Sequence, residues 1–204
     1  MRISNNISSI NFHGMIENRG LESQVTSAYI QPGIPQIDAS CFYNCYNLTA
    51  INSDNSVKMI GDYAFYNCSS LKSINFLGTS NKELRVIGDH AFDGCGLESV
   101  KINHQGSVSD SSLDSWCFAN CHQLTSVEFT NSTYLGAHMF DGCEKLREVK
   151  LNNYHSYVGD YAFANCKSLA KITFPPKMYM LSEHMFDGCI NLTAIDFGES
   201  SDLR

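Results

Sequence analysis

Residues 60–76 read IGDYAFYNCSSLKSINF, and the chain carries seven copies of this pattern at intervals of 22 to 27 residues. Every copy has a Phe, with an aliphatic residue five positions before it and a Cys three positions after it. The Phe residues are Phe42, Phe65, Phe92, Phe118, Phe140, Phe163 and Phe186, and the Cys residues are Cys45, Cys68, Cys95, Cys121, Cys143, Cys166 and Cys189. Self-similarity at such a period predicts a solenoid, in which each repeat forms one coil that packs on its neighbours.

The second half of each repeat reads L-x-x-I-x-F or a close variant, as in Leu124 to Phe129. This alternation predicts a strand whose apolar side chains face the core. Residues 7–12 and 25–30 fit the same frame, although the half-repeat between them is degenerate. The sequence therefore predicts nine parallel strands, of which the first two precede the regular repeats.

The residue just before the repeated Cys is Asn or Gly in all seven copies, as at Asn67 and Gly94. These residue types tolerate a positive φ, so the chain is expected to turn there in a left-handed conformation. Asp62, Asp89 and Asp160 are placed to cap a helical turn that would end at this residue. We therefore expect an α/β solenoid with one parallel strand and one short helical turn per coil.

The pattern I-G-D-x-A-F-x-x-C-x-x-L-x-x-I-x-F resembles the BspA-like (Treponema-type) leucine-rich repeat, over about residues 25–197. The resemblance implies a right-handed leucine-rich-repeat superhelix, adhesion to a host or cell-surface protein, and a location at the cell surface or outside the cell. It implies no shared catalytic residues and no cofactor. This chain departs from the bacterial pattern because it shows no signal peptide, and because only Pro175 keeps the usual Pro after the strand.

Three segments follow from the repeat boundaries: degenerate repeats at 1–36, seven regular repeats at 37–197, and a C-terminal tail at 198–204. A solenoid needs polar caps at its ends. No helical turn precedes the first expected strand, and only seven residues follow Phe197. We expect both ends to expose core, which predicts either a longer array or self-association through the uncapped ends.

The composition excludes several classes of protein. Hydrophobic residues make up 43% and charged residues 17% of 204 residues, which is typical of a folded domain. The net charge of −7 argues against nucleic acid as a partner, because phosphate binding depends on Lys and Arg. No apolar run of membrane-spanning length is present, so direct membrane insertion is not expected.

The nine cysteines invite two interpretations. In a solenoid the repeated Cys side chains would point the same way, which predicts a column of buried free thiols. A zinc site is the alternative, with Cys41/Cys45 and Cys117/Cys121 as the close pairs. Two thiols do not complete a zinc site, and the pairs lie three coils apart, so no metal is expected.

Two surfaces are candidates for binding. A column of mostly aromatic side chains is expected on the convex side, either as a cover for the outer turns or as a contact strip; it consists of Ser40, Tyr63, His90, Trp116, His138, Tyr161 and His184. The concave strand face is the usual binding surface of a solenoid. Its candidate binding residues are Lys101, Glu128, Arg147, Glu148, Lys150 and Lys171.

Three functions remain open on this basis. A module that binds a protein ligand on the strand face is favoured, and an architectural array that spaces other domains is the alternative. The third is an enzyme such as a parallel β-helix polysaccharide lyase, which would need three strands per coil. The sequence holds no nucleophile elbow, P-loop, HExxH or dinucleotide motif, so we expect no catalysis.

Overall fold

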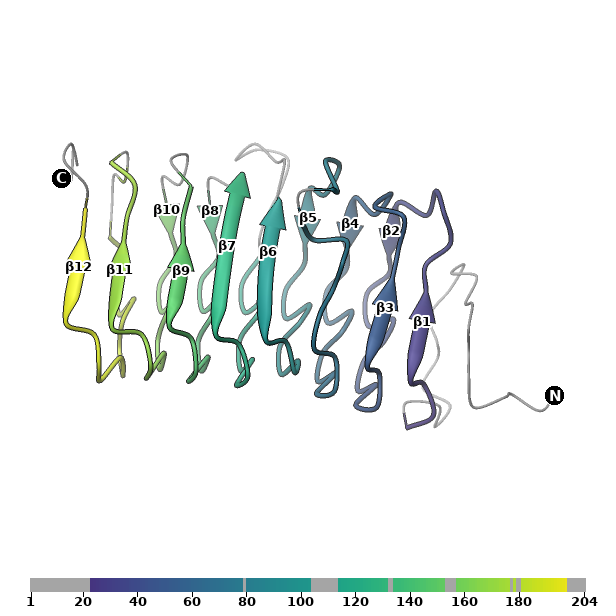
Figure 1. Ribbon diagram of the computed structural model, residues 1–204, viewed down its shortest axis with the longest axis horizontal. Helices are drawn as coiled ribbons and strands as arrows, with labels where there is room; N and C mark the ends of the chain where they lie inside the picture. The colour runs from purple at the N-terminus through teal and green to yellow at the C-terminus, as the bar shows by residue number, and fades with distance from the viewer. Residues whose placement is uncertain are drawn as a thin grey trace.

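The chain winds into a parallel β-solenoid whose coils stack along the long axis of the molecule (Figure 1). The structure, a computed structural model, describes residues 23–78, 80–103, 114–131, 134–152, 157–176, 178 and 181–197. Within them one row of strands contains β1 (Ser27–Tyr29), β3 (Ala50–Asn52), β6 (Ser99–Asn103), β7 (Ser126–Asn131), β9 (Glu148–Lys150), β11 (Lys171–Thr173) and β12 (Ala194–Asp196). The second row contains the two-residue strands β2 (Gln36–Ile37), β4 (Met59–Ile60), β5 (Val86–Ile87), β8 (Tyr134–Leu135) and β10 (Tyr157–Val158).

The solenoid expected from the repeat is confirmed, and the nine expected strands are confirmed in part. The expectation of one strand per coil is wrong, because the second row adds a two-residue strand to five of the described coils. β1 lies within the expected strand at residues 25–30, whereas the strand expected at residues 7–12 lies outside the described residues. No strand forms at residues 71–76. Just after this segment the buried Asn81 donates its Nδ2 to the carbonyl oxygens of Val57 and Phe76, at 2.7 and 3.0 Å. The Asn81 side chain thus links the longest repeat to Val57 of the coil before it.

The helical turn expected in each coil is wrong, because the described residues contain no helix. Two residues of each turn lie in the left-handed region, four positions apart, as Tyr63 (φ 55°) and Asn67 (φ 57°) show. The backbone N–H of Tyr63 donates to Asp89 O at 2.8 Å, and that of Asn67 donates to Asp93 O at 2.7 Å. These donors bond to the next coil instead of to a residue four positions back, as an α-helix requires.

The left-handed Asn/Gly position before each repeated Cys is confirmed in all seven copies, with φ between 52° and 76°. The Asp caps act differently from the expectation. Asp62 Oδ1 accepts the backbone N–H of Asp89 at 3.0 Å, and Asp89 Oδ1 accepts that of Ser115 at 2.8 Å. Each carboxylate therefore caps the neighbouring coil rather than a helix of its own coil.

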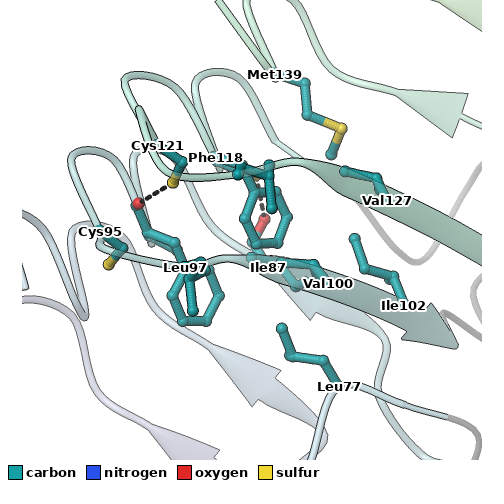
Figure 2. Packing of buried hydrophobic residues seen from close by; sticks show 14 of the residues in the cluster. Leu77, Ile87, Cys95, Leu97, Val100, Ile102, Phe118, Cys121, Val127 and Met139 are labelled. Carbon is teal, nitrogen blue, oxygen red and sulfur yellow. Dashed lines mark hydrogen bonds between the residues drawn. The ribbon is translucent and has the colours of Figure 1, made fainter. Parts of the chain in front are cut away.

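A single hydrophobic core runs between the two rows of strands. The repeated Phe rings stack on one another through the whole array, with centroids 5.0 Å apart for Phe42 and Phe65 and 5.9 Å apart for Phe163 and Phe186. Figure 2 shows one section, in which Phe118 lies among Ile87, Val100 and other apolar side chains of adjacent coils. The core thins in the last described coil, where the exposed fraction of Ile195 is 40%.

Candidate functional site

The strand face carries a regular grid of polar side chains because adjacent strands pair in register. Lys101 of β6 lies beside Glu128 of β7, which lies beside Lys150 of β9. Two positions earlier in the same strands the register places Ser99 beside Ser126. The alternate residues, such as Val100 and Val127, face the core. The grid is thus a direct product of the two-residue period of the strands.

The charges of this grid are paired and accessible to solvent. Lys101 Nζ lies 2.7 Å from Glu128 Oε1, and Lys150 Nζ lies 3.0 Å from Glu148 Oε1. The four side chains are between 40% and 61% exposed. The Glu148 carboxylate beside Lys150 raises the pKa of that amine, so Lys150 stays protonated at neutral pH. Exposed ion pairs of this kind contribute little to stability, typically below about 1 kcal/mol.

A shallow hollow of about 170 Å³ lies at the centre of the grid. Its lining includes Ser99 and Ser126, together with the four charged side chains Lys101, Glu128, Glu148 and Lys150. A second hollow of about 540 Å³ begins at Glu148 and Lys150 and extends over Thr173 to Pro176. The sequence missed Ser99 and Ser126 as candidates because a serine on a strand has no distinctive pattern.

The structure brings four of the six candidate residues together around the first hollow. Lys171 lies one strand further along and pairs with Asp196 of β12 at 3.6 Å. Arg147 is exposed, precedes β9, and does not line either hollow. The arrangement offers amines, carboxylates and hydroxyls at the spacing of parallel strands, which is suited to directed hydrogen bonds with a partner.

The cysteine column forms a ladder of buried free thiols, as the packing argument predicted. Each repeated Cys after the first donates its S–H to the carbonyl oxygen of the Phe one coil earlier, as from Cys95 to Phe65 at 3.0 Å. Burial raises the pKa of the Cys95, Cys117 and Cys143 thiols well above the ordinary value. The neutral thiol is a poor nucleophile and a poor metal ligand.

The structure offers no geometric support for the zinc alternative. Across the described part of the chain, no three His, Cys, Asp or Glu side chains are grouped to hold one metal ion. Cys117 instead donates its S–H to Asp114 O at 2.7 Å, and Cys121 donates to Phe92 O at 3.2 Å. The thiols of Cys117 and Cys121 thus donate to separate backbone carbonyls.

No helix in the described ranges is long and apolar enough to span a membrane.

The aromatic column forms a continuous stack of six rings along the turns. The centroid separations are 4.8 Å for Tyr63–His90, 5.5 Å for His90–Trp116, 3.8 Å for Trp116–His138, 4.7 Å for His138–Tyr161 and 4.7 Å for Tyr161–His184. All six residues have positive φ, which is a rare conformation for bulky side chains. Stacking and the backbone bonds to the next coil hold them there.

Each imidazole of the stack is bound by a carboxylate three residues later. The Nδ1 atoms of His90 and His184 lie 2.7 Å from Asp93 and Asp187, and that of His138 lies 2.9 Å from Asp141. The pattern H-x-x-D marks these pairs in three repeats. These pairs were not predicted as contacts from the sequence, because His and Asp three positions apart have no fixed geometry until the conformation of the turn is known.

Comparison with known proteins places this architecture among bacterial repeat proteins. A family model described as BspA type Leucine rich repeat region matches in six copies, at residues 3–115, 35–153 and 85–203. A leucine-rich-repeat protein of T. pallidum is similar at 26% identity and a TM-score of 0.60, over 72% of this chain and 65% of that one.

A leucine-rich cell surface protein of Faecalibacterium prausnitzii is similar in fold, at 22% identity and a TM-score of 0.54. The similarity covers 87% of this chain and 61% of that one. The chain therefore spans less than two thirds of the length of either solved structure. No curated protein matches the chain.

Proposed function

Because the chain belongs to the BspA-type leucine-rich-repeat family, we propose that it is a protein-binding module of the adhesion type, with the strand face as its binding surface. The F. prausnitzii protein of similar fold is described as a cell surface protein, and we extend that location to this chain as part of the proposal. The proposed ligand is a protein on a host or neighbouring cell. The module performs no catalysis and needs no cofactor.

One observation carries the proposal: the charged side chains on β6, β7 and β9 are held in place by paired strands, yet their exposed ion pairs contribute little to the stability of the fold. The strands that present Lys101, Glu128 and Lys150 are fixed by backbone pairing and by the buried Val residues between them. A preorganised surface loses little conformational entropy when it binds. Exposed charges that contribute little to stability remain able to form ion pairs with a partner.

The hollow lined by Ser99 and Ser126 provides a place for one side chain of a partner. Small hydroxyl-bearing residues leave the space, and the flanking amines and carboxylates direct hydrogen bonds from both sides. A volume of about 170 Å³ is too small for a drug-sized ligand, for which clefts hold roughly 300 Å³ or more. The hollow itself is therefore suited to one side chain of a protein partner rather than to a drug-sized molecule.

The test is a selection of short displayed peptides on the immobilised chain, followed by affinity measurements with charge-reversal variants. The variant K101E/K150E/K171E reverses three amines on the strand face. Its matched control, K58E/K145E/K167E, reverses three amines that lie outside the grid, where Lys58 and Lys167 pair with Glu83 and Glu144.

The proposal predicts selected peptides whose binding falls at least ~10-fold, about 1.4 kcal/mol, in the strand-face variant and stays within about twofold in the control. A selection that enriches no sequence, or binders that both variants weaken equally, would contradict it. Either result would favour the architectural alternative, in which the array spaces other domains and has no ligand on this face.

A further inference from the structure

A second surface, formed by the turns that follow the short strands, carries carboxylates but no Lys or Arg side chain. We name it the turn face and define it by residues 38–45, 61–68, 88–95, 114–121, 136–143, 159–166 and 182–189. These segments contain no Lys and no Arg. Their nine carboxylates are Asp38, Asp62, Asp89, Asp93, Asp114, Asp141, Asp160, Glu183 and Asp187.

The lysines that form ion pairs in the described part of the chain lie elsewhere on the molecule. Every Lys ion pair between described residues lies outside the turn face, as with Lys72–Glu98 and Lys167–Glu144. On the turn face, Asp93 and Asp141 are bonded to histidines and to asparagine amides, which do not neutralise the negative charge when the imidazole is neutral. The negative potential of this face is therefore not cancelled by its own surroundings.

Several coils form the same turn without a carboxylate at these positions. Asp62, Asp89 and Asp160 cap the next coil, yet Ser115 and Ala137 occupy the same repeat position in other coils. Asp93, Asp141 and Asp187 bind imidazoles at a position that holds Tyr43, Tyr66, Ala119 and Ala164 in the other four regular coils. Like charges stacked along one face repel one another, and this repulsion opposes the hydrogen bonds that the same carboxylates form between coils.

The aromatic stack on the same face adds hydrogen-bond acceptors. Its ring planes cover one another, so the ring edges and polar atoms are the parts left for a partner. The Nδ1 atoms of the three histidines contact the carboxylates of Asp93, Asp141 and Asp187, so in the neutral tautomer with its proton on Nδ1 the Nε2 atom is left as an acceptor. Carboxylates, imidazole Nε2 atoms and phenolic oxygens together make a rigid face dominated by acceptors.

We propose that the turn face is a docking surface for a Lys- and Arg-rich segment of another protein, bound in extended form along the stack. Lys and Arg side chains are cationic and purely hydrogen-bond donors, so they match both the charge and the acceptors of the face. Seven coils at about 4.8 Å each give a length of roughly 30 Å, which an extended segment of about nine residues spans. This proposal does not rest on the strand face.

The test uses a synthetic Lys/Arg-rich peptide that lacks Trp, with a Glu-rich peptide of equal length as its counterpart. Trp116 is the only Trp of the chain and lies within the stack, so its fluorescence reports on the turn face directly. We expect the basic peptide to bind at low salt with a change in Trp116 emission, and to be released as salt is raised. The acidic peptide should not bind.

The variant D62N/D89N/D160N removes three exposed carboxylates of the turn face and keeps an amide oxygen to cap the next coil. Its matched control, E83Q/E98Q/E144Q, removes three exposed carboxylates that pair with Lys elsewhere. We expect at least a tenfold loss of affinity in the first and less than a twofold loss in the second. Thermal unfolding verifies that both variants remain folded.

Three outcomes would overturn the proposal: no binding of the basic peptide at low salt, equal losses in both variants, or binding without any change in Trp116 emission. The strand-face variant K101E/K150E/K171E separates the two proposals. Retained binding of the basic peptide in that variant supports the turn face, whether or not a ligand for the strand face is found. Loss of this binding there would instead assign the basic peptide to the strand face.

Discussion

The thiol of Cys121 donates a hydrogen bond to the carbonyl oxygen of Phe92, which lies 29 residues earlier, across 3.2 Å. The same oxygen accepts the backbone N–H of Cys95 at 3.1 Å. The relationship recurs from coil to coil, for example between Cys68 and Phe42 and between Cys143 and Phe118. The Cys column therefore fills space in the core and also provides a donor from the next coil to each Phe carbonyl.

The raised thiol pKa values predict that the protein loses stability in alkali. Burial raises the pKa of Cys121 and Cys143 in the folded state, whereas the unfolded thiols titrate near their ordinary value of about 8.5. The stabilisation is therefore complete below that value and is lost as pH rises above it. Urea unfolding as a function of pH should show the free energy of unfolding falling by up to roughly 1.4 kcal/mol per pH unit for each buried thiol. A free energy that stays level above this pH would contradict the assignment, and Cys121→Ala should reduce the slope.

Thiol accessibility provides a second check on the ladder. A thiol-specific reagent at neutral pH should label the native protein slowly and all nine thiols after denaturation, because the native thiols are buried. Cys189 is expected to be labelled first, since it lies in the last described coil and is 9% exposed while Cys143 and Cys166 are 0% exposed. Peptide mapping by mass spectrometry identifies the order, and early labelling of Cys143 would contradict it.

Removal of one ring from the Phe stack should be strongly destabilising. Phe118 is fully buried between Phe92 and Phe140, with centroids 5.2 and 5.7 Å away. We expect Phe118→Ala to lower the free energy of unfolding by about 3–5 kcal/mol, measured by urea denaturation. Tyr46→Ala is the control, because Tyr46 is 44% exposed and its loss should cost within about 0.5 kcal/mol. Equal effects of the two substitutions would argue against a continuous core.

Alanine substitutions at two glycines distinguish the cost of backbone strain from the cost of steric crowding between coils. Gly33 has φ 81° and no heavy atom within 4 Å of a Cβ built on it, so Gly33→Ala should cost only the left-handed strain, about 1–2 kcal/mol. Gly142 has φ 76°, and its Cβ would lie 2.7 Å from Asn120 Oδ1. Gly142→Ala should therefore be the more destabilising substitution in thermal unfolding, and the reverse order would show that the coils do not approach this closely.

The strand-face ion pair should be nearly neutral for stability. Lys101 and Glu128 are 46% and 40% exposed, so Lys101→Ala and Glu128→Ala are each expected to change the free energy of unfolding by less than about 1 kcal/mol. The proposed binding function predicts a larger effect of Lys101→Ala on the affinity of a selected peptide than on stability. A loss of several kcal/mol of stability would instead assign this pair to the fold.

The sequence by itself determined the solenoid, because the spacing of Phe and Cys repeats with a period that only stacked coils satisfy. It also determined the left-handed Asn/Gly position, since few residue types adopt a positive φ at low cost. The polar residues of the strand face follow from the alternation of side chains along a strand. These features depend on local conformational preferences, so they can be predicted from the sequence of a single repeat.

Only the tertiary structure decided the conformation of the turns and the adjacency of side chains from different coils. The backbone donors of Tyr63 and Asn67 bond to the next coil, so no helical turn forms, and no local pattern reveals that choice. The ring stack and the placement of Glu128 between two lysines arise from the register between coils. Register relates segments that lie more than twenty residues apart in the sequence. It is therefore set only when neighbouring coils pack against the same core.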